Sequence, residues 1–89
     1  MEEVLFKSEE PKSRGDVATF LRQLADKVEG GEVILRQGDQ EQQVRIPPNL
    51  VLETKLERET KRDGEKMSLE VELEWRPGGG SATSGIELA

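Results

Sequence analysis

Six charged residues at every second position of two segments could carry chemistry, because this spacing places them on one face of β-strands. They are Glu53, Lys55, Glu57, Glu70, Glu72 and Glu74. Carboxylate oxygens at such positions could ligate a hard cation or serve as acid and base. The 89-residue chain has no His and no Cys, which removes the commonest general base, the commonest metal ligand and every thiolate. We therefore expect no enzyme, no metal and no cofactor, and interpret the six residues as a candidate partner-binding face.

Two segments with the alternation of β-strands must position this face. Apolar and polar side chains alternate along residues 50–62 and 65–76, a period of two that places one set on each side of a strand. Asp63-Gly64 between the segments is a two-residue hairpin signal. The sequence thus predicts a hairpin with the six residues on one face and apolar side chains on the other.

The apolar pattern also predicts the register of this hairpin, because a slip of one residue would turn every side chain to the opposite face. With Asp63 and Gly64 as the loop, apolar residues meet apolar residues, whereas a three-residue loop would set Leu56 against a glutamate. The predicted pairs are Leu56 with Val71, Thr54 with Leu73, Leu52 with Trp75, Lys55 with Glu72, Glu57 with Glu70 and Glu53 with Glu74. The last two bring like charges together at a cost of roughly a few tenths of a kcal/mol each.

A helix is predicted ahead of these strands. Ser13 is placed to cap it, with Asp16 in its first turn, and Gly30-Gly31 ends it because glycine accepts the left-handed conformation. Apolar residues recur at spacings of three and four along one side of the helix. This stripe consists of Val17, Phe20, Leu21, Leu24, Ala25 and Val28. The helix therefore has one side to bury against a sheet.

The remaining segments predict three more strands. Residues 2–9 alternate loosely and predict a short first strand that ends before a proline. Residues 32–37 and 40–46 flank Gly38-Asp39, a second two-residue hairpin signal. Together with the hairpin that carries the charged residues, this gives five strands.

These elements predict an α+β fold in which a single helix packs on one face of a mostly antiparallel five-stranded sheet, in the order β-α-β-β-β-β. A loop at residues 47–49 would pair the two hairpins with each other. One apolar row would then run through Val33, Val44, Leu52 and Trp75. The domain is expected to occupy residues 1–76, and the Gly/Ser-rich tail at 77–89 is expected to be disordered.

The same elements resemble a known family. The run MSLEVELEWR, the N-terminal EEVLFKSE, the helix RGDVATFLRQLADKVEGGEV and the strand VLETKLERET together are similar to the amphi-Trp domain family, named for amphipathic strands and a tryptophan. The resemblance covers residues 1–76 and implies a small prokaryotic domain without an assigned activity or site residue. Trp75, the residue that the family pattern singles out, is expected to lie in the core, since it has the largest apolar area to bury. The alternative is a stacking platform for a base or sugar.

Charge narrows the class of partner. A net charge of −6 argues against binding to nucleic-acid phosphates or anionic membranes. The acidic start and the absence of a long apolar run predict a cytoplasmic protein. The leading hypothesis is a non-enzymatic module that binds a protein partner or itself through the charged face or an exposed strand edge. The alternatives are an acidic nucleic-acid mimic, whose row of carboxylates Lys55 would interrupt, and a small-molecule or cation-binding domain.

Overall fold

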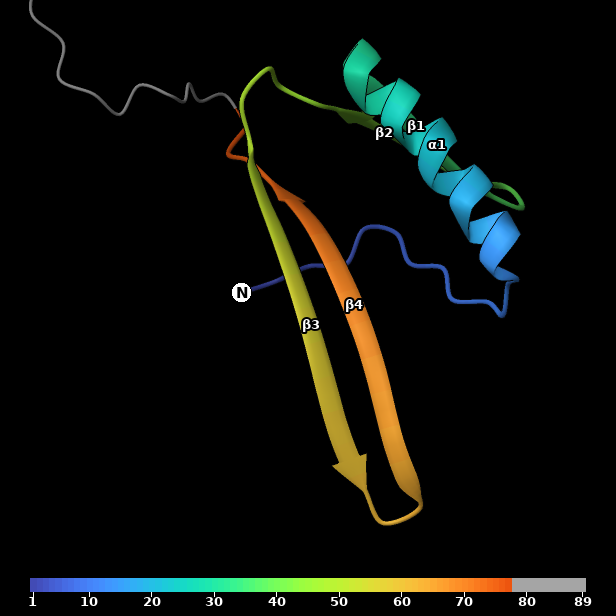
Figure 1. The fold of residues 1–89 in the computed structure, drawn as a ribbon. Coiled ribbons are helices and arrows are strands. Elements are labelled where there is room, and N and C mark those ends of the chain that lie inside the picture. The colour runs from blue at the N-terminus through green and yellow to red at the C-terminus, as the bar shows by residue number, and fades with distance from the viewer. Residues whose placement is uncertain (78–89) are drawn as a thin grey trace, which may run out of the picture. The chain divides into compact units, whose positions relative to one another are not determined.

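The computed structural model of the chain describes residues 1–77 and divides the chain into two compact units, Met1–Ile46 and Pro47–Ala89 (Figure 1). The described elements are α1 (Arg14–Gly30), β1 (Glu32–Gln37), β2 (Gln40–Arg45), β3 (Val51–Lys61) and β4 (Gly64–Glu74). The predicted α+β class is confirmed, with four strands in the described residues. The tail expected to be disordered lies, apart from Pro77, outside them.

Local hydrogen bonds fix both ends of α1. The Oγ of Ser13 accepts a hydrogen bond from the backbone N–H of Asp16 at 3.1 Å, which satisfies a donor at the open end of the helix. At the other end Gly31 has a φ of +86° and donates its N–H to the carbonyl of Val28 at 3.0 Å. The predicted cap and terminus are both confirmed.

The first unit combines α1 with the hairpin of β1 and β2. Gln37 lies opposite Gln40 and Val33 opposite Val44, as predicted for a Gly38-Asp39 turn. α1 packs against β1, and the N–H of Ile46 donates to the carbonyl of Gly31 at 2.8 Å. Of the residues that the structure describes, only Val33 is buried, with 7% of its surface exposed.

The half-buried apolar residues of this unit are Phe6, Ala18, Leu24, Val28, Leu35, Val44 and Ile46. The first unit therefore has a small core beneath one side of the helix.

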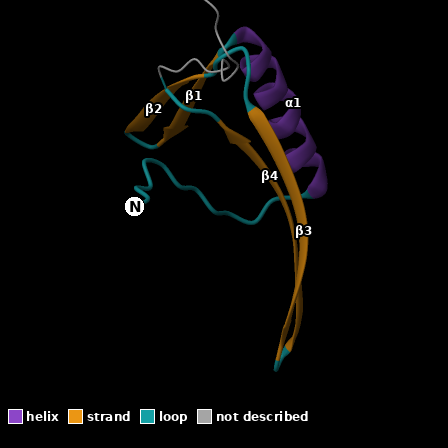
Figure 2. Cartoon of the chain, turned by 90° about the vertical axis from the view of Figure 1, so that its left-hand side faces the viewer, coloured by secondary structure: helices purple, strands orange, loops and turns teal. Residues whose placement is uncertain are grey.

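The second unit is the antiparallel hairpin of β3 and β4 (Figure 2). Its register differs from the prediction by two residues. Lys61 pairs with Gly64, so Arg62 and Asp63 form the loop instead of Asp63 and Gly64. The observed pairs are Leu56 with Leu69, Thr54 with Val71, Leu52 with Leu73, Lys55 with Glu70, Glu53 with Glu72 and Glu57 with Ser68. A shift of two residues keeps every side chain on its face, so the apolar pattern cannot distinguish the two registers.

The single five-stranded sheet is not formed in the described residues. The strands make two two-stranded sheets, β1 with β2 and β3 with β4, and of the predicted four-strand row only the pair of Val33 with Val44 is present. Residues 2–9 form no strand, and two of their apolar side chains, Val4 and Leu5, are exposed. Pro47 and Pro48 lie in the segment of the chain that joins β2 to β3, and proline has no N–H to donate to a strand ladder.

Trp75 lies one residue beyond the end of β4 and is half-buried. Its partner is not Leu52, because that residue pairs with Leu73. The described residues thus place Trp75 at the border of the hairpin and not in a fully buried core.

Gly64→Ala is expected to destabilise the β3–β4 hairpin by about 1–2 kcal/mol. Gly64 has a φ of +139°, which alanine resists, although nothing lies within 4 Å of the Cβ that it would add. Amide hydrogen exchange of β3 and β4 measures the effect. Gly30→Ala is the matched control, because its added methyl also meets open space but its φ is not positive. Equal protection of the hairpin in both variants would show that the turn tolerates a side chain at Gly64.

Candidate protein-interaction site

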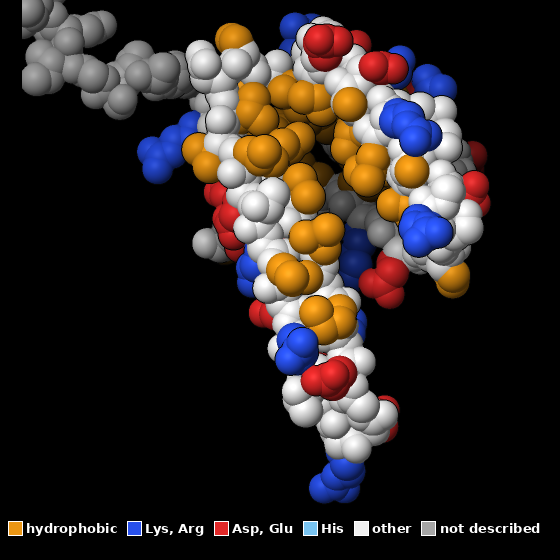
Figure 3. Space-filling view, in the orientation of Figure 1, with side chains coloured by type: hydrophobic (Ala, Val, Ile, Leu, Met, Phe, Trp, Pro, Cys, Tyr) orange, Lys and Arg blue, Asp and Glu red, His pale blue; other side chains and the backbone are white. Residues whose placement is uncertain are grey.

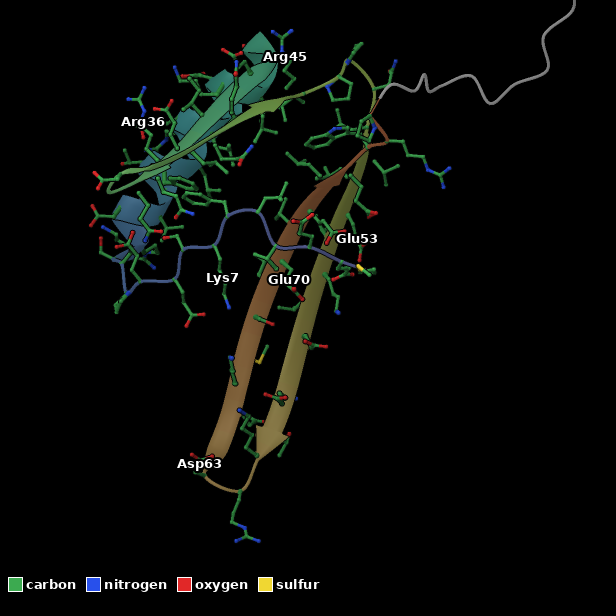
Figure 4. The ribbon with its side chains drawn as sticks, turned by 180° about the vertical axis from the view of Figure 1, so that it is seen from behind. Lys7, Arg36, Arg45, Glu53, Asp63 and Glu70 are labelled. Carbon is green, nitrogen blue, oxygen red and sulfur yellow. The ribbon has the colours of Figure 1, made fainter. Side chains whose placement is uncertain are left out.

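The six residues singled out by the sequence do share one face of the β3–β4 hairpin. Glu53, Lys55 and Glu57 alternate along β3, and Glu70, Glu72 and Glu74 alternate along β4. We call this set the charged face. All six side chains are exposed, and Figure 4 shows Glu53 and Glu70 on the two strands with Asp63 in the loop. The face was predicted correctly because it depends only on the alternation.

Lys55 lies at the centre of the charged face. Its Nζ is 3.7 Å from an oxygen of Glu57 and 3.8 Å from an oxygen of Glu70, so Glu70 takes the cross-strand position predicted for Glu72. Exposed pairs of this kind contribute little to stability, about 0–1 kcal/mol each. They do interrupt the row of carboxylates, which speaks against a face spaced like nucleic-acid phosphates.

Glu53, Glu72 and Glu74 form a second cluster of carboxylates on the charged face, which is outside the ion pairs of Lys55. One carboxylate oxygen from each lies within 4.8 Å of the others. A hydrogen bond with Glu72 and the negative charge of Glu72 raise the pKa of Glu74, and slight desolvation and Glu53 add to the rise. Calcium takes about six to eight oxygen ligands, and three fully exposed carboxylates are an ordinary feature of an acidic strand face. We therefore assign no metal to this group.

The opposite side of the hairpin is apolar. We call it the apolar face, and it consists of Leu52, Leu56, Met67, Leu69, Val71 and Leu73. Leu73 is half-buried, and the other five are 53% to 74% exposed. Figure 3 shows hydrophobic side chains following one another along the hairpin. The sequence had placed these residues in a core, so their exposure is a correction to that prediction.

Exposure of this kind has a large energetic consequence. Complete burial of one leucine, valine or methionine side chain is worth about 1.5–3 kcal/mol. Contiguous apolar patches above a few hundred Å² are rare on monomeric proteins and usually mark interaction sites. The apolar face is therefore the surface of the hairpin with the most to gain from a partner.

A groove of about 850 Å³ lies in the first unit, between the N-terminal segment, α1 and β1. Its walls include Phe6, Phe20 and Ile34 as well as Lys12, Lys27 and Arg36. This groove was not predicted, since residues 2–9, which include Phe6, were expected to form a strand. Apolar side chains and charges of both signs line the groove, and this mixture selects no particular ligand.

The comparisons with known proteins agree with the resemblance found in the sequence. The model of the family described as the Amphi-Trp domain matches residues 1–89. The match includes residues 77–89, which the resemblance had left outside. No curated protein and no solved structure matches the chain. Within the described residues, no helix has the length and apolar character to cross a membrane.

Glu74 is expected to titrate above its ordinary pKa of 4.5 in an NMR titration of the side-chain carboxyl carbons. Glu72→Gln should return the midpoint toward that value, because the hydrogen bond with the Glu72 carboxyl group and then the charge of that group are the two largest causes of the raised pKa. Glu57→Gln is the control, since Glu57 is not among the causes of the rise. A midpoint that Glu72→Gln does not lower would contradict the proximity of the two carboxylates.

The sign of the linked stability effect follows from the raised pKa. Folding favours the protonated form of Glu74, so its contribution is fully present below pH 4.5 and is lost as the pH rises through the raised pKa. The stability of the hairpin, taken from hydrogen-exchange protection at each pH, should therefore depend less on pH in Glu74→Gln than in the natural chain.

Proposed function

The chain belongs to the Amphi-Trp domain family, and we propose that it is a non-enzymatic interaction module whose β3–β4 hairpin binds a partner protein through the apolar face. The observation that carries this proposal is the exposure of five apolar side chains on one face of two eleven-residue strands. Strands of that length extend for about 36 Å, which is long enough to present a continuous binding surface.

The chemistry of the apolar face favours a protein as the partner. Its side chains are aliphatic or thioether groups with no hydrogen-bonding atoms to read a base or a sugar. Nucleic acids and anionic lipids are disfavoured by the net charge of −6. Aliphatic surfaces gain most from burial against another apolar surface of similar shape. The expected partner therefore offers an apolar helix face or sheet face.

Polar groups border the apolar face. Arg58 and Glu65 form an exposed ion pair of 3.7 Å near the hairpin tip, at one end of the apolar face. An apolar centre with a polar border is the usual anatomy of a protein interface. It supports a partner that covers the base and middle of the hairpin more completely than the tip.

The charged face is the second candidate surface for the same function. Exposed charges mainly change the rate of encounter and its salt dependence, whereas buried apolar groups set the rate of dissociation. We assign the charged face the role of steering a partner whose surface is basic. In this proposal affinity comes from the apolar face.

Leu52→Thr combined with Leu56→Thr is expected to weaken partner binding about tenfold or more, since each leucine is worth more than about 1.4 kcal/mol when buried. Threonine keeps strand propensity, and both positions are on β3. The matched control is Glu53→Gln with Glu57→Gln, which changes the opposite face of the same strand. Partners are recovered on each immobilised variant, quantified by mass spectrometry, and then titrated in purified form with Trp75 fluorescence as the signal.

Hydrogen exchange of β3 and β4 confirms that both double variants keep the hairpin. If the glutamine variant loses the partner and the threonine variant keeps it, the charged face is the binding site. If both variants bind as tightly as the natural chain, the hairpin is not the binding site.

A further inference from the structure

Both strands of the β3–β4 hairpin have an outer edge. In the part of the chain that the structure describes, β3 pairs only with β4 and β4 only with β3. Every second residue along such an edge directs its N–H and C=O groups away from the hairpin, and these groups can pair with another strand. An isolated two-stranded hairpin is marginal in water, and three or more strands are usually needed for stability. The edges are therefore sites at which the hairpin would gain from an added strand.

We propose that β4 pairs along its outer edge with β4 of a second copy of this chain, antiparallel and with Leu69 opposite its own copy. The result is a two-fold symmetric sheet in the order β3-β4-β4-β3. The proposal concerns the strand edge and not the apolar face, so it stands or falls separately from the proposed function.

Full overlap of the two β4 strands selects this register. β4 runs from Gly64 to Glu74, so its central residue is Leu69 and each residue meets the one at the mirrored position. The resulting pairs are Lys66 with Glu72, Ser68 with Glu70 and Gly64 with Glu74 on the charged side, and Met67 with Val71, Leu69 with Leu69 and Glu65 with Leu73 on the apolar side. The Glu65–Leu73 pair at each end is the one mismatch of this register. Opposite charges meet twice and no like charges meet, which favours the pairing.

Shifted registers are less favourable. A shift of one residue sets apolar side chains against charged ones. A shift of two in one direction places Glu70 opposite its own copy. A shift of two in the other direction, with Lys66 opposite Glu70, avoids like charges but leaves the last two residues of β4, Leu73 and Glu74, unpaired.

The edge of β3 is a poorer site for the same kind of pairing. Full overlap of two β3 strands, Val51–Lys61, sets Glu53 opposite Glu59 twice. It also sets Lys55 opposite Glu57 twice, so its attractive and repulsive charge pairs cancel, whereas full overlap of β4 makes only attractive charge pairs. Pairing of β4 with β3 of another copy would leave open edges and extend without end. The two-fold β4 pairing stops at two copies, because the edges that it leaves open are those of β3, the poorer site.

The two-fold axis is perpendicular to the sheet, so the apolar faces of both copies lie on the same side. Twelve side chains of Leu, Met and Val then form one continuous surface, six from each copy. Pairing thus doubles the area that the proposed function offers to a partner, and it adds the strands that a lone hairpin lacks.

The test uses two charge-reversed chains. In its own homodimer, Lys66→Glu places a glutamate opposite Glu72, and Glu72→Lys likewise places a lysine opposite Lys66. Each variant alone should dimerise about tenfold more weakly than the natural chain, or worse, because two opposite-charge pairs become like-charge pairs. When the two variants are mixed, every such pair has opposite charges again. A heterodimer should therefore form with an affinity near that of the natural homodimer.

Native mass spectrometry with one variant ¹⁵N-labelled distinguishes the heterodimer from both homodimers, and sedimentation gives the dissociation constants. Glu70→Lys is the register control, since Glu70 faces Ser68 in the proposed pairing. It should dimerise alone, and it should restore Lys66→Glu no better than the natural chain does, since either partner supplies one Lys66 opposite Glu72 and leaves the other pair repulsive. Lys66→Glu also sets a glutamate opposite Glu59 within the chain and could weaken the hairpin itself. Mixing with Glu72→Lys would not repair such damage, so dimerisation that returns on mixing reports the contact between the two chains.

Three results would overturn the proposal. The first is a natural chain that sediments as a monomer at every concentration. The second is a dimer that neither single reversal weakens, because the contact then lies elsewhere, as on the apolar face. The third is rescue of Lys66→Glu by Glu70→Lys in place of Glu72→Lys, which would establish the shifted register. Dimerisation that persists in the Leu52→Thr, Leu56→Thr variant would separate the edge contact from the proposed partner site.

Discussion

The alternation of apolar and charged side chains along β3 and β4 is the constraint on which the second unit depends. Because the side-chain period of a strand is two, the backbone hydrogen bonds that pair these strands also sort their side chains into an apolar face and a charged face. A two-stranded hairpin has no second layer of its own to cover either face. The strands of the hairpin are therefore joined by their backbone hydrogen bonds, while five side chains of its apolar face are exposed.

The first unit shows what one covering layer achieves. α1 packs on β1, and Val33 of β1 is buried while Leu24 and Val28 of α1 are half-buried. Yet Phe20 and Leu21 on the same helix are more than half exposed. A seventeen-residue helix against a two-stranded sheet is too small to bury its whole stripe, as expected for short chains. Both units thus carry more apolar surface than they cover, a pattern that fits a chain whose stability is raised by association.

The features of this fold that were predicted correctly depend on residues close together in the sequence. Ser13, Gly31 and the Gly38-Asp39 turn act through hydrogen bonds and backbone angles within a few residues, and the structure confirms all three. The charged face was also correct, because membership of a face depends only on whether a position is odd or even. Non-local terms caused the failures: residues 2–9 have the pattern of a strand but no partner backbone, and the exposure of the apolar face depends on which layers are present. The register error of two residues lies between these cases, since the turn and not the alternation decides it.

Apolar area and charge contribute different properties to this hairpin. Burial is non-directional, so the apolar face by itself would accept many apolar surfaces at many offsets. Charged pairs are selective, because a shift of two residues can convert an attractive pair into a repulsive one. β4 carries a single basic residue, Lys66, among glutamates at positions 65, 70, 72 and 74, and almost any close approach of a second acidic strand is unfavourable unless Lys66 lies opposite one of them. Since the two kinds of side chain occupy opposite sides of the same strands, affinity can be tuned on one side without altering the register that the other side selects.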